Sequence, residues 1–115
     1  MKDKFLHDTI IQAIEDLKGE DICTLNVAEL TSFTDEMIIV SGNSNRHVKA
    51  IANNVSIDTK KANLTPFSIE GQNNGEWILL DFGDLVLHVM LHETRKHYDL
   101  EKLWTPHLRQ TEETT

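Results

Sequence analysis

Hydrophobic positions recur with helical spacing in two segments of the chain. The first stripe spans residues 4–18 and consists of Leu6, Ile10, Ala13, Ile14 and Leu17, and Gly19 follows it as a stop signal. The second spans residues 45–62 and consists of Val48, Ile51, Ala52, Val55 and Ala62. Ser44 precedes it, and serine commonly caps a helix N-terminus. The spacing predicts two amphipathic helices, with Ile57 on the outer side of the second.

Shorter apolar runs predict five strands, at residues 22–27, 36–41, 67–70, 77–82 and 85–92. The run Met37-Ile38-Ile39-Val40 is unbroken, which is typical of a strand buried on both faces. A further helical segment begins near Glu93 and includes Tyr98, Leu100, Leu103 and Trp104. These elements predict an α/β (mixed α+β) domain, with a mixed sheet of roughly five strands packed with helices.

The pair Gly83-Asp84 predicts a two-residue hairpin turn, which fixes the pairing of the strands on either side. Phe82 then faces Leu85, Leu80 faces Leu87 and Ile78 faces Val89, and these six side chains form an apolar core face. The opposite face, here called the second face, receives Asp81 opposite Val86, Leu79 opposite His88 and Trp77 opposite Met90. It mixes apolar groups with a carboxylate, an imidazole and an indole.

Two interpretations of the second face compete. Helices cover it, and hydrogen bonds satisfy Asp81 and His88; or it is open, Trp77 and Met90 anchor a partner, and Asp81 binds a cation. Aromatic residues and Met are enriched at protein interfaces. Composition alone favours the covered arrangement.

Length and composition restrict the class of protein. The 115 residues fit one domain, which we place at residues 1–104, followed by a polar and flexible tail at residues 105–115. The net charge of −8 argues against broad binding of nucleic acid, which needs a basic face. Cys23 has no second cysteine to pair with, and no apolar run approaches the ~18 residues of a membrane span. These features predict a cytoplasmic protein.

The charge is unevenly distributed. Residues 45–69 carry a net charge of +3, whereas residues 70–93 contain five carboxylates and no Lys or Arg. The acidic segment also holds the most apolar strands. A surface that is both acidic and apolar favours docking of a basic protein, and a solvated acidic rim is the simpler alternative.

The histidines do not form a metal site by spacing. His92 and His97 lie five positions apart, whereas the zinc protease motif needs four on one helix. His88 and His92 share a strand face but lie about 13 Å apart. Cys23 and His47 suggest no nucleophile dyad. The sequence thus predicts no metal, no cofactor and no catalytic residue.

The loop Gly42-Asn43-Ser44, between a strand and a helix, could in principle hold a phosphate on backbone N–H groups. Nucleotidyltransferases add two metal-binding carboxylates shortly after such a loop. Here only Asp81 and Asp84 remain as candidates, and Asp84 suits the turn. An N-capped helix after a tight turn is the favoured interpretation.

Two sets of residues match the signatures of a known protein family. The first set of matching residues is Thr34-Asp35, Ser41-Gly42, Ser44 and Arg46-His47. The second set is Glu70-Gly71, Trp77, Asp81-Phe82-Gly83-Asp84, Val86, His88-Val89, Tyr98, Leu100-Glu101 and Leu103-Trp104. The match extends from about Phe5 to Trp104. Together these residues resemble the Iojap (RsfS) family of ribosomal silencing factors.

The resemblance implies a non-enzymatic factor that binds the large ribosomal subunit through ribosomal protein L-fourteen and blocks joining of the small subunit, notably when nutrients are short. It also implies a nucleotidyltransferase-like fold without the catalytic carboxylates. It favours an open second face, with partner-binding residues Trp77, Leu79, Asp81, His88, Met90, Glu70 and Asp84. We further expect a homodimer in the free state and little direct contact with nucleic acid. A large-subunit assembly factor is the alternative, and a residual nucleotidyltransferase is a more distant one.

Overall fold

The computed structural model describes residues 4–100 and residue 102 of the chain. Its elements follow the order α1 (Lys4–Asp16), β1 (Glu20–Asn26), β2 (Glu36–Gly42), α2 (Asn45–Lys61), β3 (Ser68–Glu70), β4 (Trp77–Asp81), β5 (Leu85–Leu91) and α3 (His92–Tyr98). The five strands form one mixed sheet in the order β1-β2-β5-β4-β3. Only β2 and β5 pair in parallel, and the other neighbours are antiparallel. The predicted fold class is confirmed.

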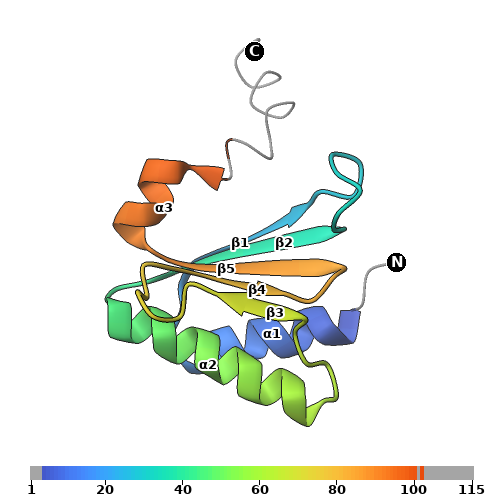
Figure 1. Cartoon of the computed structure of the whole chain (residues 1–115), viewed down its shortest axis with the longest axis horizontal. Helices are drawn as coiled ribbons and strands as arrows, with labels where there is room; N and C mark the ends of the chain where they lie inside the picture. Colours follow the sequence, from blue (N-terminus) through green and yellow to red (C-terminus); the bar gives the residue numbers. More distant parts are fainter. Residues whose placement is uncertain (1–3, 101, 103–115) are drawn as a thin grey trace.

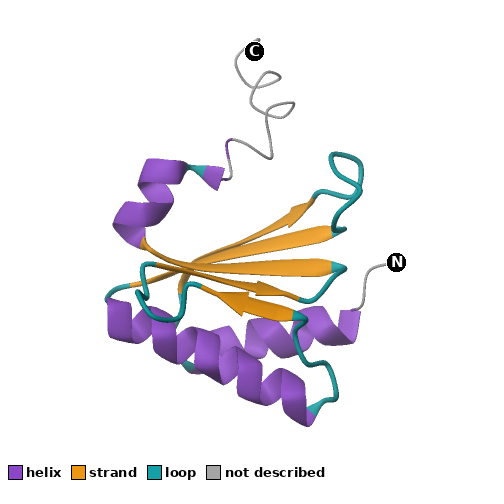
Figure 2. Cartoon of the chain, in the orientation of Figure 1, coloured by secondary structure: helices purple, strands orange, loops and turns teal. Residues whose placement is uncertain are grey.

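The helices lie on opposite sides of the sheet, as Figures 1 and 2 show. α1 and α2 pack side by side on one face, and α3 lies on the other. The main core lies between the sheet and the helix pair. It includes Ile10 and Ile14 from α1, Ile51 and Val55 from α2, and Leu87 from β5, all with no exposed side-chain surface.

The hairpin of β4 and β5 has the predicted register. Leu80 lies opposite Leu87 and Ile78 opposite Val89, and the Phe82 N–H donates to the Leu85 carbonyl across the turn at 2.9 Å. Gly83 has a φ of 88°, in the left-handed region that favours glycine. The local turn chemistry therefore sets which side chains face the helices.

Both predicted helices are confirmed, with small differences. Ser44 caps α2, and its Oγ accepts a hydrogen bond from the His47 N–H at 3.0 Å. Thr59 rather than Ala62 completes the buried stripe, because its hydroxyl donates to the Val55 carbonyl one turn earlier. Ile57 is 42% exposed, as predicted from its place on the helix.

Strand β2 is buried along its whole length, as the apolar run predicted. Its first residue, Glu36, has an ionisable side chain and yet is only 1% exposed. The imidazole Nδ1 of His7, on α1, lies 2.6 Å from Glu36 Oε2. The other oxygen, Oε1, has no hydrogen-bond partner among the described residues. This partly buried contact ties the beginning of α1 to the start of β2.

Strand β1 forms one edge of the sheet and is irregular. Its pairing with β2 shifts register between Glu20 and Cys23, and Asp21 has a positive φ of 51°. Such a bulge bends an edge strand and exposes fewer regularly spaced backbone groups. Glu20 and Asp21 are both exposed at this bulge.

Helix α3 covers the first part of the predicted helical segment, which is interrupted at Asp99 and is helical again at Leu100 and Lys102. It begins at His92 and ends after Tyr98, because Asp99 adopts a left-handed conformation and its N–H donates to the Arg95 carbonyl at 2.8 Å. Leu100 follows and is buried. Leu103, Trp104 and the predicted tail at residues 105–115 lie outside the described residues.

Candidate docking face

The register of the strands aligns the side chains of the second face in rows across the sheet. One row runs from Glu70 through Leu79 and His88 to Ile39 and Cys23. A neighbouring row contains Asp81 and Val86, and a third pairs Trp77 with Met90. The sheet thus brings all of the strand residues that we predicted to bind a partner onto one face.

Burial divides the second face into two halves. On the side of β1, β2 and β5, a small second core consists of Val27, Met37, Ile39, Met90 and Leu100. On the side of β4 and β3, Trp77, Leu79 and Asp81 are partly exposed and Glu70 is exposed. The face is therefore covered on one side and accessible on the other.

The expectation that His88 and Met90 are available for docking is wrong. Met90 has no exposed surface and His88 is 5% exposed. Leu100, which follows the left-handed Asp99, packs into the second core that contains Met90. An interface anchor needs exposed surface that a partner can cover. His88 and Met90 therefore do not serve as anchors and instead pack beneath the accessible side chains.

Trp77 connects the covered and accessible halves. Its indole Nε1 donates a 2.9 Å hydrogen bond to His88 Nδ1, and its ring lies 4.9 Å from that of Tyr98 on α3. Burial lowers the pKa of His88 from 6.5 to about 4, so the imidazole is neutral at pH 7. Because Nδ1 accepts a hydrogen bond, the proton resides on Nε2, which has no partner among the described residues.

The carboxylates of the accessible half lie around its apolar side chains. Asp81 Oδ1 accepts a hydrogen bond from the Gly83 N–H at 2.8 Å, which holds the carboxylate at the hairpin turn. Asp84 occupies the turn itself and is exposed. Glu70 lies beside Leu79 on the edge strand β3. This half therefore presents three acids next to a partly exposed Trp and Leu.

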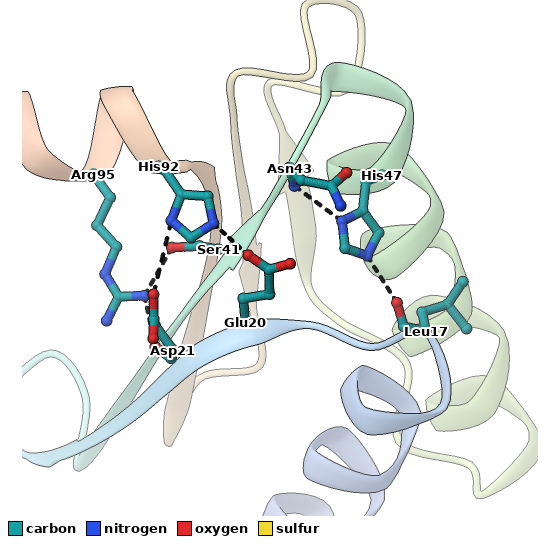
Figure 3. Close-up of polar contacts among 8 residues, drawn as sticks. All are labelled: Leu17, Glu20, Asp21, Ser41, Asn43, His47, His92 and Arg95. Carbon is teal, nitrogen blue, oxygen red and sulfur yellow. Dashed lines mark hydrogen bonds and ion pairs between the residues drawn. The ribbon is translucent and has the colours of Figure 1, made fainter.

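Polar contacts hold α3 against the sheet (Figure 3). Arg95 donates to the Asp21 carbonyl at 2.6 Å and to Ser41 Oγ at 2.9 Å, and His92 Nε2 lies 2.6 Å from Glu20 Oε1. No residue of α3 is buried. The position of this helix, and with it that of Tyr98 over Trp77, therefore depends on groups at the β1 edge. Sequence reasoning missed this, because the partners are more than 50 positions apart.

The loop Gly42-Asn43-Ser44 is occupied by contacts within the protein. His47 Nδ1 accepts from the Asn43 N–H at 3.0 Å, and its Nε2 lies 2.7 Å from the Leu17 carbonyl (Figure 3). One backbone donor that a phosphate would use is therefore already engaged. His47 instead joins the start of α2 to the end of α1.

The loop and the carboxylates of the hairpin lie at opposite ends of the sheet. Gly42 pairs with Leu91 on β5, whereas Asp81 pairs with Val86 on the other side of the same strand. Five residues of strand separate these positions by about 17 Å. Asp81 therefore cannot supply a metal-binding carboxylate to this loop.

Within residues 4–100 and 102, no group of three or more His, Cys, Asp or Glu side chains is arranged to hold a metal ion. None of the helices in this part of the chain is long and apolar enough to span a membrane.

Comparison with known proteins identifies the family. Residues 2–115 match the family model described as "Ribosomal silencing factor during starvation". The ribosomal silencing factor RsfS of Chromobacterium violaceum is 49% identical over 94 residues, which cover 82% of this chain and 77% of that protein. A mouse protein named "Mitochondrial assembly of ribosomal large subunit protein 1" is 38% identical over 105 residues, which cover 89% of this chain and 46% of the relative.

The fold agrees with the sequence match. A crystal structure of a Chromobacterium violaceum protein superposes with a TM-score of 0.87 at 45% identity, covering 90% of this chain and 87% of that one. The family match spans every element described above, from α1 to α3. The chain therefore belongs to the RsfS family of ribosomal silencing factors.

Proposed function

We propose that this chain binds the large ribosomal subunit in the cytoplasm, through the accessible half of the second face, and sterically blocks joining of the small subunit. The partner on the subunit is ribosomal protein L-fourteen, as the family resemblance implies. This is a binding function that needs no catalysis and no cofactor. Family membership supports a role in ribosomal silencing.

The observation that carries the proposal is the close grouping of Trp77 and Leu79 with three carboxylates. The register places Glu70 beside Leu79 and Asp81 on the same face, and Asp84 lies in the adjoining turn. A partly exposed aromatic group provides contact area, and surrounding acids favour a basic partner and speed its encounter. Ribosomal proteins that bind RNA are commonly basic, so the charges are complementary.

Sucrose-gradient sedimentation of purified subunits tests the proposal. We expect the protein to migrate with large subunits and to reduce the fraction of joined ribosomes when it is added first. A protein that remains at the top of the gradient would refute docking. A protein that migrates with large subunits without reducing joining would refute the steric block and leave the docking intact.

The second candidate function is assistance in assembly of the large subunit. The name of the mouse relative, which refers to assembly of the ribosomal large subunit, favours it. Assembly and silencing can use the same docking face, so the two differ in when the protein acts. Accumulation of incomplete large subunits after depletion in growing cells supports assembly. A defect confined to starved cells supports silencing.

We also propose that the free protein forms a homodimer through the accessible half of the second face. The partly exposed Trp77 and Leu79 lie together there, and apolar surface of this kind favours self-association. The dimer then competes with ribosome binding. Analytical ultracentrifugation at rising protein concentration tests this, and a monomer at every concentration would contradict it.

A further inference from the structure

The outer side of α2 carries a row of cations in a protein whose net charge is −8. Arg46, Lys49, Lys60 and Lys61 are all exposed. With 3.6 residues per turn, they fall within an arc of about 120°, opposite the buried stripe of the helix. Arg46 and Lys61 are separated by fifteen residues, or about 22 Å along the axis. We call these four residues the α2 ridge.

The cations of the α2 ridge are not paired with carboxylates of the described chain. Within the described part of the chain, the ion pairs are those of His7 and His92 with carboxylates, and none includes a residue of the α2 ridge. Acids near its borders include Asp58, half-buried on the same helix, Glu20, which lines a hollow together with Arg46, and Glu76, which follows the Gly75 that adjoins Lys49. The rest of the arc holds Ala50, Asn53 and Ile57.

A hollow of ≈ 230 Å³ adjoins the ridge, between α2 and the β3–β4 strands. Its polar lining consists of Lys49, Asn53, Ser56 and Gln72, and its apolar lining of Ala52, Ile69 and Ile78. No carboxylate lines it, although the chain as a whole is acidic. An ammonium, two amides and a hydroxyl offer the donors that commonly bind phosphate and ribose oxygens.

We propose that the α2 ridge binds the phosphate backbone of ribosomal RNA when the protein is docked on the large subunit. This rests on the proposed function and departs from the expectation of little contact with nucleic acid. That expectation follows from the net charge, whereas phosphate contacts depend on local charge.

The chemistry of the ridge favours RNA over an acidic protein as its partner. A protein interface needs buried aromatic or aliphatic anchors, and the ridge offers only the partly exposed Ile57 at its centre. Phosphate contacts need cations and hydrogen-bond donors without an apolar core. The acidic second face lies across the sheet from α2, so the two surfaces can engage different components of one subunit (Figure 1).

Cross-linking identifies what the ridge touches. Ile57→Cys in a Cys23→Ser background places one thiol at the centre of the ridge and leaves all four cations in place. The thiol is labelled with an azidophenacyl group, and the protein is bound to purified large subunits and irradiated. We expect an adduct that RNase removes. An adduct with a ribosomal protein, or no adduct from protein that migrates with the subunit, would overturn the inference.

The salt dependence of binding provides a second measurement. A triple variant is tested: Lys49→Gln/Lys60→Gln/Lys61→Gln. Its slope of log Kd against log salt concentration should be lower by roughly 2–3, because each phosphate contact that is lost contributes about 0.7–0.9 to the slope. Lys4→Gln, which removes an exposed cation from α1, is the control and should leave the slope unchanged. Equal slopes for the triple variant and the unaltered protein would overturn the inference. Failure of the unaltered protein to bind subunits would instead refute the proposed function, on which the inference depends.

Discussion

The indole of Trp77 and the imidazole of His88 are joined across neighbouring strands by a 2.9 Å hydrogen bond from Nε1 to Nδ1. The two residues are diagonal neighbours in the antiparallel register, since Trp77 lies opposite Met90 and His88 opposite Leu79. One partner is nearly inaccessible and the other is partly exposed. The hydrogen bond therefore fixes the orientation of an accessible aromatic group from within the core.

Replacement of Trp77 tests its role in docking. Trp77→Ala removes the largest side chain of the accessible half and should weaken binding to large subunits by about 2 kcal/mol or more, roughly 30-fold in Kd. Trp77→Phe keeps an aromatic ring but loses the N–H donor, so it should bind more tightly than Trp77→Ala. Binding is measured by fluorescence anisotropy with labelled protein. Equal affinity of Trp77→Ala and the unaltered protein would exclude Trp77 as an anchor.

Burial of His88 predicts a loss of stability in mild acid. The pKa of His88 is about 4 in the folded protein and 6.5 in the unfolded chain, so the unfolded chain binds more protons between these values. Stability should therefore be highest above pH 6.5 and should fall towards pH 4. The shift corresponds to about 3 kcal/mol. Urea unfolding of His88→Phe should show a shallower decline over this range, and parallel declines would contradict the prediction.

The contact between His7 and Glu36 should contribute to stability. His7→Ala removes the group that lies 2.6 Å from the Glu36 side chain, which is 1% exposed. The free energy of unfolding should fall by about 2 kcal/mol. The loss is smaller than for a fully buried pair, because His7 is itself partly exposed. Glu36→Gln replaces the carboxyl group with an amide of nearly the same size. In the double variant, the loss should be smaller than the sum of the two single losses. Strict additivity in chemical denaturation would show that the contact contributes nothing.

Gly71 should be the least replaceable glycine of the second half of the chain. It has a φ of 87°, and a Cβ there would lie 2.0 Å from the Trp77 carbonyl oxygen. Gly71→Ala should therefore destabilise the protein by roughly 3 kcal/mol or more. Gly83→Ala is the matched control, since its φ is 88° but its nearest neighbour is the ring of Phe67, which is 80% exposed and can move. Equal thermal stabilities of the two variants would contradict the prediction.

The sequence predicted those features that depend on neighbouring residues. The register of the β4–β5 hairpin follows from Gly83-Asp84, and the cap of α2 follows from Ser44. Both are local, because turn and capping preferences act over a few residues. The pairs that β4 and β5 contribute to the second face, including Leu79 opposite His88, follow from the same register.

Burial on the second face could not be predicted in the same way. Met90 is covered because Asp99 turns the chain and Leu100 packs into the second core. The same holds on the helix-facing side of the sheet, where Glu36 is in contact with His7 of α1, 29 positions earlier. Such contacts join distant segments, and hydrophobic periodicity carries no information about them. Only the three-dimensional structure therefore distinguishes the accessible half of the second face from its covered half.

The irregular start of β1 has a consequence for how copies of this protein can meet. Unpaired sheet edges can pair with a strand of another molecule, which leads to open-ended aggregates as well as to dimers. The bulge between Glu20 and Cys23, together with exposed carboxylates at Glu20 and Asp21, makes this edge a poor template. At the other margin, β3 offers only three residues. Growth into fibrils is thus discouraged at both margins, which leaves face-to-face contact as the route for the proposed dimer.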